Sequence, residues 1–295
     1  MAERRVALVT GASKGGTGTA IALRLASAGF DVALVARDVD GLERTARRVR
    51  DLGRRAVELP CDLSDPEGGR GGLVTRVGDE LGPVEVLINN AAANGYRPFE
   101  EWTRARLELT QQVNVWAPWD LMAQAAPGMR ARGRGWIVNV TSFAAELAPG
   151  PPFPDTLVAT QGSAYGSSKA ALNRLTVSVA AELYDAGVAV NALAPQSAIA
   201  TPQLVGAGEI DTDRFEPLET MAEAALLLSS CDPAVLTGRI SRSLELLLEH
   251  DRAVRTLDGS RLVDGWQPGD LPELIRRRED SLAERGWPNA FASDR

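Results

Sequence analysis

Residues 5–18 read RVALVTGASKGGTG, and this stretch decides the fold of the chain. Residues 5–10 form a short apolar run that is typical of a buried strand, and residues 20–28 follow a helical pattern. The glycine-rich turn at residues 10–18 therefore leads from a strand into a helix. Glycines there let the backbone approach a pyrophosphate, and the helix N-terminus supplies amide donors and a favourable dipole. We predict a phosphate-binding turn, with an ordinary tight turn as the alternative for an isolated glycine cluster.

Further apolar runs alternate with helical patterns along the chain. Strands are predicted at residues 31–36, 55–59, 84–89, 135–141 and 188–194, with crossover helices that include residues 39–52 and 164–186. This alternation predicts an α/β fold, a doubly wound parallel sheet covered on both faces, which is the Rossmann fold. Its ligand should bind beyond the carboxyl ends of the strands.

The domain organisation follows from where this pattern stops. We find no internal repeat and no low-complexity linker, so residues 1–240 are predicted to form a single domain. Beyond residue 240 come a leucine-rich segment, a predicted hairpin at Asp258-Gly259 and a charged helical segment at 271–285. We expect residues 241–295 to be a C-terminal extension that packs on the domain or at a subunit interface, with surface decoration as the alternative.

Composition excludes several functional classes. A net charge of −7 and a pI near 5.0 argue against a nucleic-acid or acidic-membrane partner. No apolar stretch reaches the length of a membrane span, so we expect a small-molecule partner and a cytoplasmic location. Cys61 and Cys231 lack metal-ligand spacing, and the single histidine, His250, lies outside any catalytic motif. No metal site and no histidine-dependent hydrolase is therefore expected.

Only two of the 32 basic residues are lysine, and both stand inside motifs. Lys14 lies in the glycine-rich turn, and Lys169 ends the segment YGSSK, four residues after Tyr165. A tyrosine ionises near pH 10, so it serves as an acid or base at neutral pH only if the phenolate is stabilised. An ammonium on the same helix face acts in that direction. An isolated pair is commonly helix surface, but with Ser142 and Asn114 it becomes a candidate catalytic group.

The order of these motifs resembles the short-chain dehydrogenase/reductase family, in its common short form rather than its extended form. The resemblance runs from residue 6 to residue 238 and rests on the glycine turn, Asp62-Leu63, Asn89-Asn90-Ala91-Ala92, Asn114, Ser142, Tyr165, Lys169 and the segment ending at Pro195. It implies an NADP-dependent oxidoreductase that interconverts a ketone and a secondary alcohol. It also implies a homodimer or homotetramer assembled through the helices that carry Asn114 and Tyr165.

The resemblance implies a role for each catalytic residue. Tyr165 would exchange a proton with the carbonyl or alcohol oxygen, and Ser142 would hydrogen-bond the same oxygen. Lys169 would hold the nicotinamide ribose and lower the pKa of Tyr165, while Asn114 would anchor a water in the proton relay. The implied cofactor contacts are Gly11, Ser13, Lys14, Gly16, Thr17, Gly18, Arg37, Asp62, Leu63, Asn90, Ala91, Pro195 and Thr201. Candidate substrate-pocket residues are Phe143, Phe153 and Tyr96.

The end of the second strand favours NADP(H) over NAD(H). An NAD enzyme usually places a carboxylate where Ala36 stands, whereas an arginine such as Arg37, helped by Lys14, suits a 2′-phosphate. Asp38 keeps NAD(H) open as the alternative. A non-catalytic nucleotide-binding regulatory protein on the same fold is the rival to an enzyme, and an enoyl reductase is disfavoured because those relatives space tyrosine and lysine more widely.

Three departures from the family pattern point to remodelled loops. The glycine turn is one residue longer than usual, so either Gly15 or Gly16 can fill the second glycine position. Gln196-Ser197 replace the usual glycine after Pro195, with an extra residue before Thr201. Ser142 and Tyr165 lie 23 residues apart because a proline-rich segment intervenes. We expect residues 148–162 to form part of the substrate-pocket rim.

Overall fold

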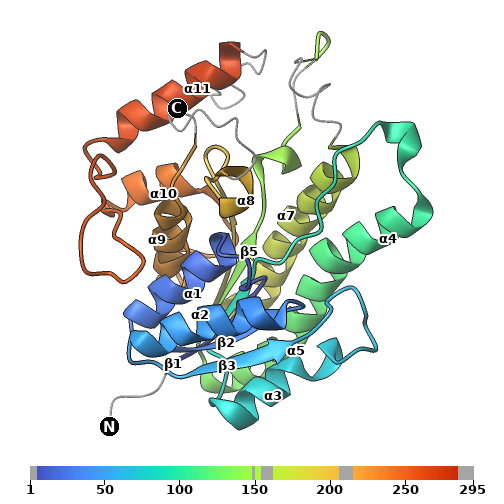
Figure 1. Ribbon diagram of the computed structural model, residues 1–295, viewed down its shortest axis with the longest axis vertical. Coiled ribbons are helices and arrows are strands. Elements are labelled where there is room, and N and C mark those ends of the chain that lie inside the picture. The colour runs from blue at the N-terminus through green and yellow to red at the C-terminus, as the bar shows by residue number, and fades with distance from the viewer. Residues whose placement is uncertain (1–4, 148–149, 154–161, 206–214, 285–295) are drawn as a thin grey trace.

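Seven parallel strands form the centre of the molecule. The structure, a computed structural model, describes residues 5–147, 150–153, 162–205 and 215–284. The strands are β1 (Arg5–Thr10), β2 (Phe30–Ala36), β3 (Ala56–Pro60), β4 (Val86–Asn89), β5 (Gly135–Val140), β6 (Val188–Ala194) and β7 (Ile240–Arg242). They lie in the order β3-β2-β1-β4-β5-β6-β7 (Figure 1). This order confirms the predicted doubly wound Rossmann fold. The short strand β7 was missed, because three residues are too few for a hydrophobic period.

Helices cover both faces of the sheet (Figure 1). One face is covered by α1 (Thr17–Ser27), α2 (Val39–Asp51), α9 (Leu218–Leu228) and α10 (Ser243–Glu249). The other is covered by α3 (Leu73–Glu80), α5 (Ala117–Arg132) and α7 (Ser163–Leu183), with α4 (Arg104–Gln111) beside α7. Helix α11 (Leu271–Glu284) lies at the end of the molecule opposite the N-terminus, and the short helix α8 (Pro202–Val205) follows β6. No helix in the described parts of the chain has the length and apolar character that crossing a membrane requires.

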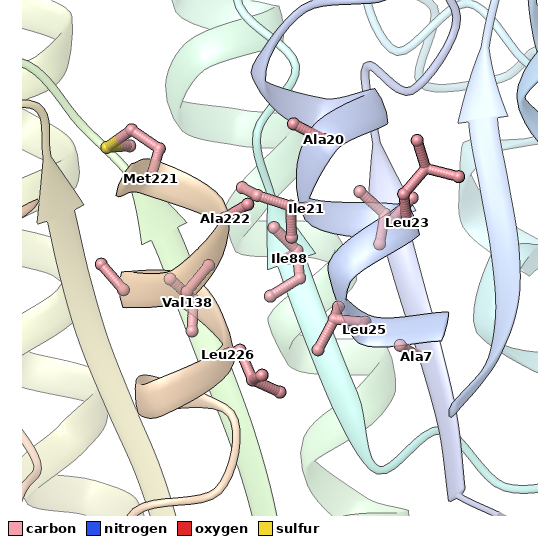
Figure 2. Packing of buried hydrophobic residues seen from close by; sticks show 14 of the residues in the cluster. Ala7, Ala20, Ile21, Leu23, Leu25, Ile88, Val138, Met221, Ala222 and Leu226 are labelled. Atoms are coloured by element: carbon pink, nitrogen blue, oxygen red, sulfur yellow. The ribbon is translucent and has the colours of Figure 1, made fainter. Parts of the chain in front are cut away.

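Apolar side chains of α1 and α9 pack against one another over the sheet. Figure 2 shows Ile21 and Leu25 of α1 beside Ala222 and Leu226 of α9, with Ile88 of β4 beneath them. All five side chains are at most 5% exposed. Burying one large aliphatic side chain of this kind contributes roughly 1.5–3 kcal/mol relative to exposure. The packing fixes the N-terminal end of α1, and with it the glycine turn.

The residues just beyond 240 share this core. Strand β7 pairs with β6. Three residues of the extension are buried in the same apolar cluster as α1 and α9: Leu244 of α10, Leu271 of α11, and Val254 in the segment between these helices. Arg255 and Leu262 pair in antiparallel fashion around Asp258-Gly259, which confirms the predicted hairpin. The first part of the extension is therefore attached to the sheet by buried apolar contacts.

Candidate active site

The predicted site residues gather beyond the carboxyl ends of the strands. The glycine turn follows β1, Arg37 follows β2, Asp62 and Leu63 follow β3, Asn90 and Ala91 follow β4, Ser142 follows β5, and Pro195 and Thr201 follow β6. The strand order reverses between β1 and β4, which is where a doubly wound sheet opens a crevice for a ligand. Parallel strands thus bring together segments that are far apart in the sequence.

Asn90 braces the glycine turn from the end of β4. Its side-chain amide donates to the carbonyl oxygen of Thr10 at 2.8 Å, and the Thr10 hydroxyl accepts from the backbone amides of Asn90 and Ala91 at 3.0 Å. A Cβ atom on Gly11 would lie 2.8 Å from the Asn90 amide nitrogen, and one on Gly18 would overlap the same atom. This close approach therefore requires glycine at both positions. Asn90 supports the turn by hydrogen-bonding to Thr10 with both its side chain and its backbone amide.

Gly15 takes a left-handed backbone conformation in the glycine turn. Its φ of +70° lies in the left-handed region that favours glycine, whereas Gly16 has an ordinary φ of −89°. Gly16 is the N-cap residue of α1, which begins at Thr17, so no side chain at that position covers the first amides of the helix. A Cβ atom on Gly16 would meet the Thr201 methyl group at 3.6 Å. The segment after β6 thus lies against the glycine turn.

The end of β2 carries a cluster of charged side chains. The Arg37 guanidinium lies 3.7 Å from the Asp62 carboxylate, and both side chains are largely exposed. Burial acts to raise the pKa of Asp62, but hydrogen bonds from Ser64 and the charge of Arg37 outweigh it and the pKa is lowered. Asp38 caps α2 by accepting from the Gly41 amide at 3.0 Å, and Arg44 lies 3.8 Å from its other oxygen. Asp38 therefore acts as a helix cap.

The other predicted cofactor residues differ in exposure. Lys14 is exposed on the turn, Ser13 is 7% exposed, and the Leu63 side chain is buried in the core at 6%. Arg44, on the first turns of α2, is a cation near Asp38 that sequence reasoning missed. Its only signal is its place six residues after Asp38, in the helix that Asp38 caps.

Ser142, Tyr165 and Lys169 meet at the carboxyl end of β5. The Ser142 side chain lies beside the Tyr165 phenol and acts to lower its pKa. The Lys169 ammonium donates to the carbonyl oxygen of Val140, the last residue of β5, at 2.8 Å, and lies 5.8 Å from the centre of the Tyr165 ring. Lys169 is 2% exposed. Helix α7 therefore presents the tyrosine and the lysine together, as their spacing predicts.

Asn114 joins this group through Ser168. It is fully buried in a π-helical turn, η3 (Gln112–Trp116), which links α4 to α5. Its side-chain amide donates at 2.9 Å to the Ala93 carbonyl and to the Ser168 hydroxyl, which in turn donates to the Tyr165 carbonyl at 2.7 Å. Widened helical turns of this kind occur often at functional sites. Ser168 was missed, although the repeated serine in YGSSK carried the signal.

Comparisons with known proteins decide the family of this site. The short chain dehydrogenase family model matches residues 5–205. The chain belongs to the short-chain dehydrogenase/reductase family. A fatty acyl-CoA reductase of Mycobacterium tuberculosis is 35% identical over 281 residues, which covers 93% of this chain and 85% of that relative.

Two solved structures of the family illustrate the likeness. Acetoin dehydrogenase from Salmonella typhimurium is 32% identical, with a TM-score of 0.70 over 82% of this chain and 94% of that one. A metagenomic short-chain oxidoreductase in complex with NADP is also 32% identical, with a TM-score of 0.67 over 81% of this chain and 96% of that one. The chain is thus an NAD(P)-dependent oxidoreductase of the short-chain dehydrogenase/reductase family.

Burial dominates the electrostatics of the Tyr165–Lys169 pair in this short-chain dehydrogenase/reductase. It raises the pKa of Tyr165 to about 12, with Tyr96 acting in the same direction and the Ser142 hydrogen bond against it. Burial also lowers the pKa of Lys169 to about 8. The sequence led us to expect that Lys169 lowers the pKa of Tyr165, but desolvation of the phenol outweighs any such effect in this structure. Tyr165 is therefore held protonated at neutral pH, which is the form that donates a proton.

Gly166 lets α7 approach the segment that carries Ser142. A Cβ atom on Gly166 would lie 2.6 Å from the carbonyl oxygen of Ala144, in the short helix η4 (Phe143–Ala145). Ser142 caps this short helix by accepting from the Ala144 amide at 3.2 Å. Sequence reasoning missed Gly166, whose signal is a glycine inside a predicted helix next to the catalytic tyrosine. The glycine allows Ser142 and Tyr165 to reach one another.

We expect Gly166→Ala to lower kcat by about 10- to 100-fold, because the added methyl group pushes Ser142 away from Tyr165. Gly78→Ala is the matched control: Gly78 is exposed in α3, and its added Cβ meets nothing within 4 Å. That control should leave kcat unchanged and stabilise the protein slightly, by about 0.5–1 kcal/mol. Steady-state kinetics and thermal unfolding of both variants test this, and an unimpaired Gly166→Ala enzyme would refute the role of close approach.

The predicted substrate-pocket residues have three different settings. The Tyr96 ring meets the Tyr165 ring edge-on, with centroids 6.1 Å apart and planes at 60°. Phe143 is half-buried in η4, and Phe153 is 57% exposed with its ring against Gly150. Residues 148–149 and 154–161 lie outside the described residues, so the predicted pocket rim is untested. Within the described parts of the chain, no three acidic, cysteine or histidine residues could hold a metal ion.

Proposed function

We propose that the protein is an NADP-dependent oxidoreductase that interconverts a ketone and a secondary alcohol with Ser142, Tyr165, Lys169 and Asn114. The observation that carries the proposal is the buried ammonium of Lys169 at the end of β5, 2.8 Å from the Val140 carbonyl oxygen and 5.8 Å from the centre of the Tyr165 ring, with Ser142 beside the phenol. A nicotinamide dinucleotide fits the neighbouring turn, where Gly15 and Gly16 carry no side chain and precede the uncovered N-terminus of α1. When bound, it supplies the hydride.

The chain's own residues manage the proton and the orientation. Tyr165, protonated at neutral pH, donates its proton to the carbonyl oxygen of a ketone, and Ser142 hydrogen-bonds the same oxygen. Two donors on one oxygen fix the carbonyl and stabilise the negative charge that develops on it. Lys169 restores charge balance beside the phenolate and orients the cofactor ribose. Asn114 and Ser168 hold the α7 backbone at Tyr165.

Arg37 supports a preference for NADP(H). It extends from the end of β2 beside Asp62, while the neighbouring acid Asp38 is engaged as the cap of α2. We expect Arg37→Ala to raise the KM for NADPH about tenfold or more and to leave that for NADH nearly unchanged, because a charge-assisted contact is worth roughly 1.5–3 kcal/mol. Arg47→Ala, at an exposed arginine of α2 that is paired with Glu43, is the control. Equal KM values for the two cofactors in the unmutated protein would contradict the preference.

A second candidate substrate class is an acyl thioester. The M. tuberculosis relative named fatty acyl-CoA reductase matches 93% of this chain, a share that must reach into the C-terminal extension. A screen of ketones, secondary alcohols and acyl-CoA thioesters that follows NADPH absorbance tests both classes. A thiol reagent in the same assay separates them, because thioester reduction releases free thiol and ketone reduction does not. NADPH binding without turnover of any of these compounds would favour the regulatory rival.

We further propose a homodimer or homotetramer. Three large apolar side chains are exposed on adjoining helical elements. Trp116 ends η3 and is 48% exposed, Trp119 on α5 is 51% exposed, and Val177 on α7 is 39% exposed. Large apolar side chains on neighbouring exposed helix faces favour contact with a second copy. Light scattering of the purified protein measures the assembly. A cytoplasmic location and the boundary at residue 240 remain predictions.

A further inference from the structure

A buried carboxylate holds the segment that follows β6. Glu216 is fully buried, and its carboxylate accepts from the Ser197 amide at 2.6 Å and from the hydroxyls of Ser243 and Thr220 at 2.6 and 2.8 Å. Its backbone pairs with the same segment, donating to the Ala198 carbonyl and accepting from the Ala200 amide at 2.9 Å each. Glu216 thus fixes the course of the chain between Pro195 and Thr201.

Arg278, in α11 of the C-terminal extension, reaches the same segment. Its side chain is 4% exposed and donates to the Ser197 hydroxyl at 3.0 Å and to the Phe215 carbonyl at 2.9 Å. A third bond, to the Leu274 carbonyl at 3.0 Å, lies within its own helix, and the guanidinium is stacked 5.1 Å from the centre of the Trp266 ring. Its charge acts to lower the pKa of Glu216, against the stronger effect of burial.

These contacts fall on a departure from the family pattern. Gln196 and Ser197 stand where the family resemblance leads us to expect a glycine, and the residues that contact them come from beyond residues 5–205, which the family model matches. The backbone amide of Gln196 donates to the Ser243 hydroxyl at 3.0 Å, and the side-chain amide of Gln196 donates to the Glu245 carboxylate of α10 at 3.0 Å. A few residues further on, Thr201 lies against Gly16 of the glycine turn. The extension therefore holds a segment that borders the cofactor turn.

We propose that Arg278 is a positioning residue through which the C-terminal extension sets the affinity for the nicotinamide cofactor. The guanidinium ties α11 to Ser197 and Phe215, so the segment keeps Thr201 at the distance from Gly16 that cofactor binding needs. Burying an arginine for stability alone is a weak strategy, because an apolar side chain of similar volume packs as well without desolvating a charge. The inference rests on the proposed cofactor site.

The test compares Arg278→Met with Arg277→Met, an exposed arginine of the same helix that is paired with Glu273. We expect Arg278→Met to raise the Kd and KM for NADPH by about tenfold or more, to leave kcat at saturating cofactor within a few-fold, and to speed amide exchange in residues 196–201. Arg277→Met should match the unmutated protein in all of these. Ser197→Ala, a smaller change that removes only the hydroxyl partner, should move them in the same direction.

Chemical rescue separates positioning from general destabilisation. Millimolar guanidinium, compared with equal sodium chloride, should restore NADPH affinity to Arg278→Ala and have no effect on Arg277→Ala. Unchanged affinity in Arg278→Met and Ser197→Ala, or an equal loss in Arg277→Met, would overturn the inference. Titration of the unmutated protein keeps the two hypotheses apart: if it binds neither NADPH nor NADH the proposed function fails, whereas binding that is insensitive to Arg278 refutes only this inference.

Discussion

Replacing Tyr165 with phenylalanine should lower kcat by about 10²- to 10⁴-fold, the range expected when a general acid is removed. The phenol lies beside Ser142, and burial raises its pKa to about 12, so it is protonated at neutral pH. The variant retains the ring and its edge-on contact with Tyr96, so folding and NADPH affinity should hardly change. Steady-state kinetics on the best substrate, together with a fluorescence titration of NADPH, measure both quantities.

Tyr184→Phe is the matched control for this exchange. Tyr184 is 49% exposed at the end of α7, and its hydroxyl donates to the Ala234 carbonyl at 3.3 Å, far along the helix from Ser142. It should keep full turnover. If Tyr165→Phe were as active as Tyr184→Phe, the proton would have to come from another donor, and the assignment of Tyr165 would be wrong.

The second large effect is expected for Lys169→Arg, which should cost about two orders of magnitude in kcat despite the conserved charge. Lys169 is 2% exposed and places a compact ammonium 2.8 Å from the Val140 carbonyl. The larger planar guanidinium has a different donor geometry. It would therefore shift the bound ribose and the Tyr165 side chain beside it from their working positions. Arg174→Lys, the reverse exchange at an exposed site of α7, should leave kcat unchanged. A nearly full rate in Lys169→Arg would show that any cation suffices.

Lys169→Arg should also change how stability depends on pH. The pKa of Lys169 is about 8 in the folded protein against an ordinary value of 10.5, so between these values the unfolded chain binds more protons. The free energy of unfolding therefore gains about 3 kcal/mol as the pH rises from 8 to 10.5, and loses it as the pH falls through 8. Arginine stays charged in both states and contributes no such rise. Urea unfolding of both proteins across this range measures the difference, and parallel curves would contradict the lowered pKa.

Much of the site follows from local sequence combined with one general rule of topology. Alternating apolar runs and helical patterns indicate a parallel sheet, and the carboxyl ends of its strands must then lie at one edge. That is why Ser142, which follows β5, and the Tyr165–Lys169 pair could be placed together without any contact information. The hydrophobic period and the four-residue spacing along a helix are local properties, so they can be read directly from the chain.

Other features depend on contacts between residues distant in sequence. The π-helical turn at Asn114 and the approach of Gly166 to Ala144 are set by how helices pack, which no local pattern encodes. The same holds for Arg278, 81 residues from the Ser197 hydroxyl that it contacts. Sequence alone determined which chemical groups the protein carries and at which edge of the sheet they lie. Only the tertiary structure decided their protonation and mutual support, because burial and long-range hydrogen bonds arise when separate elements pack together.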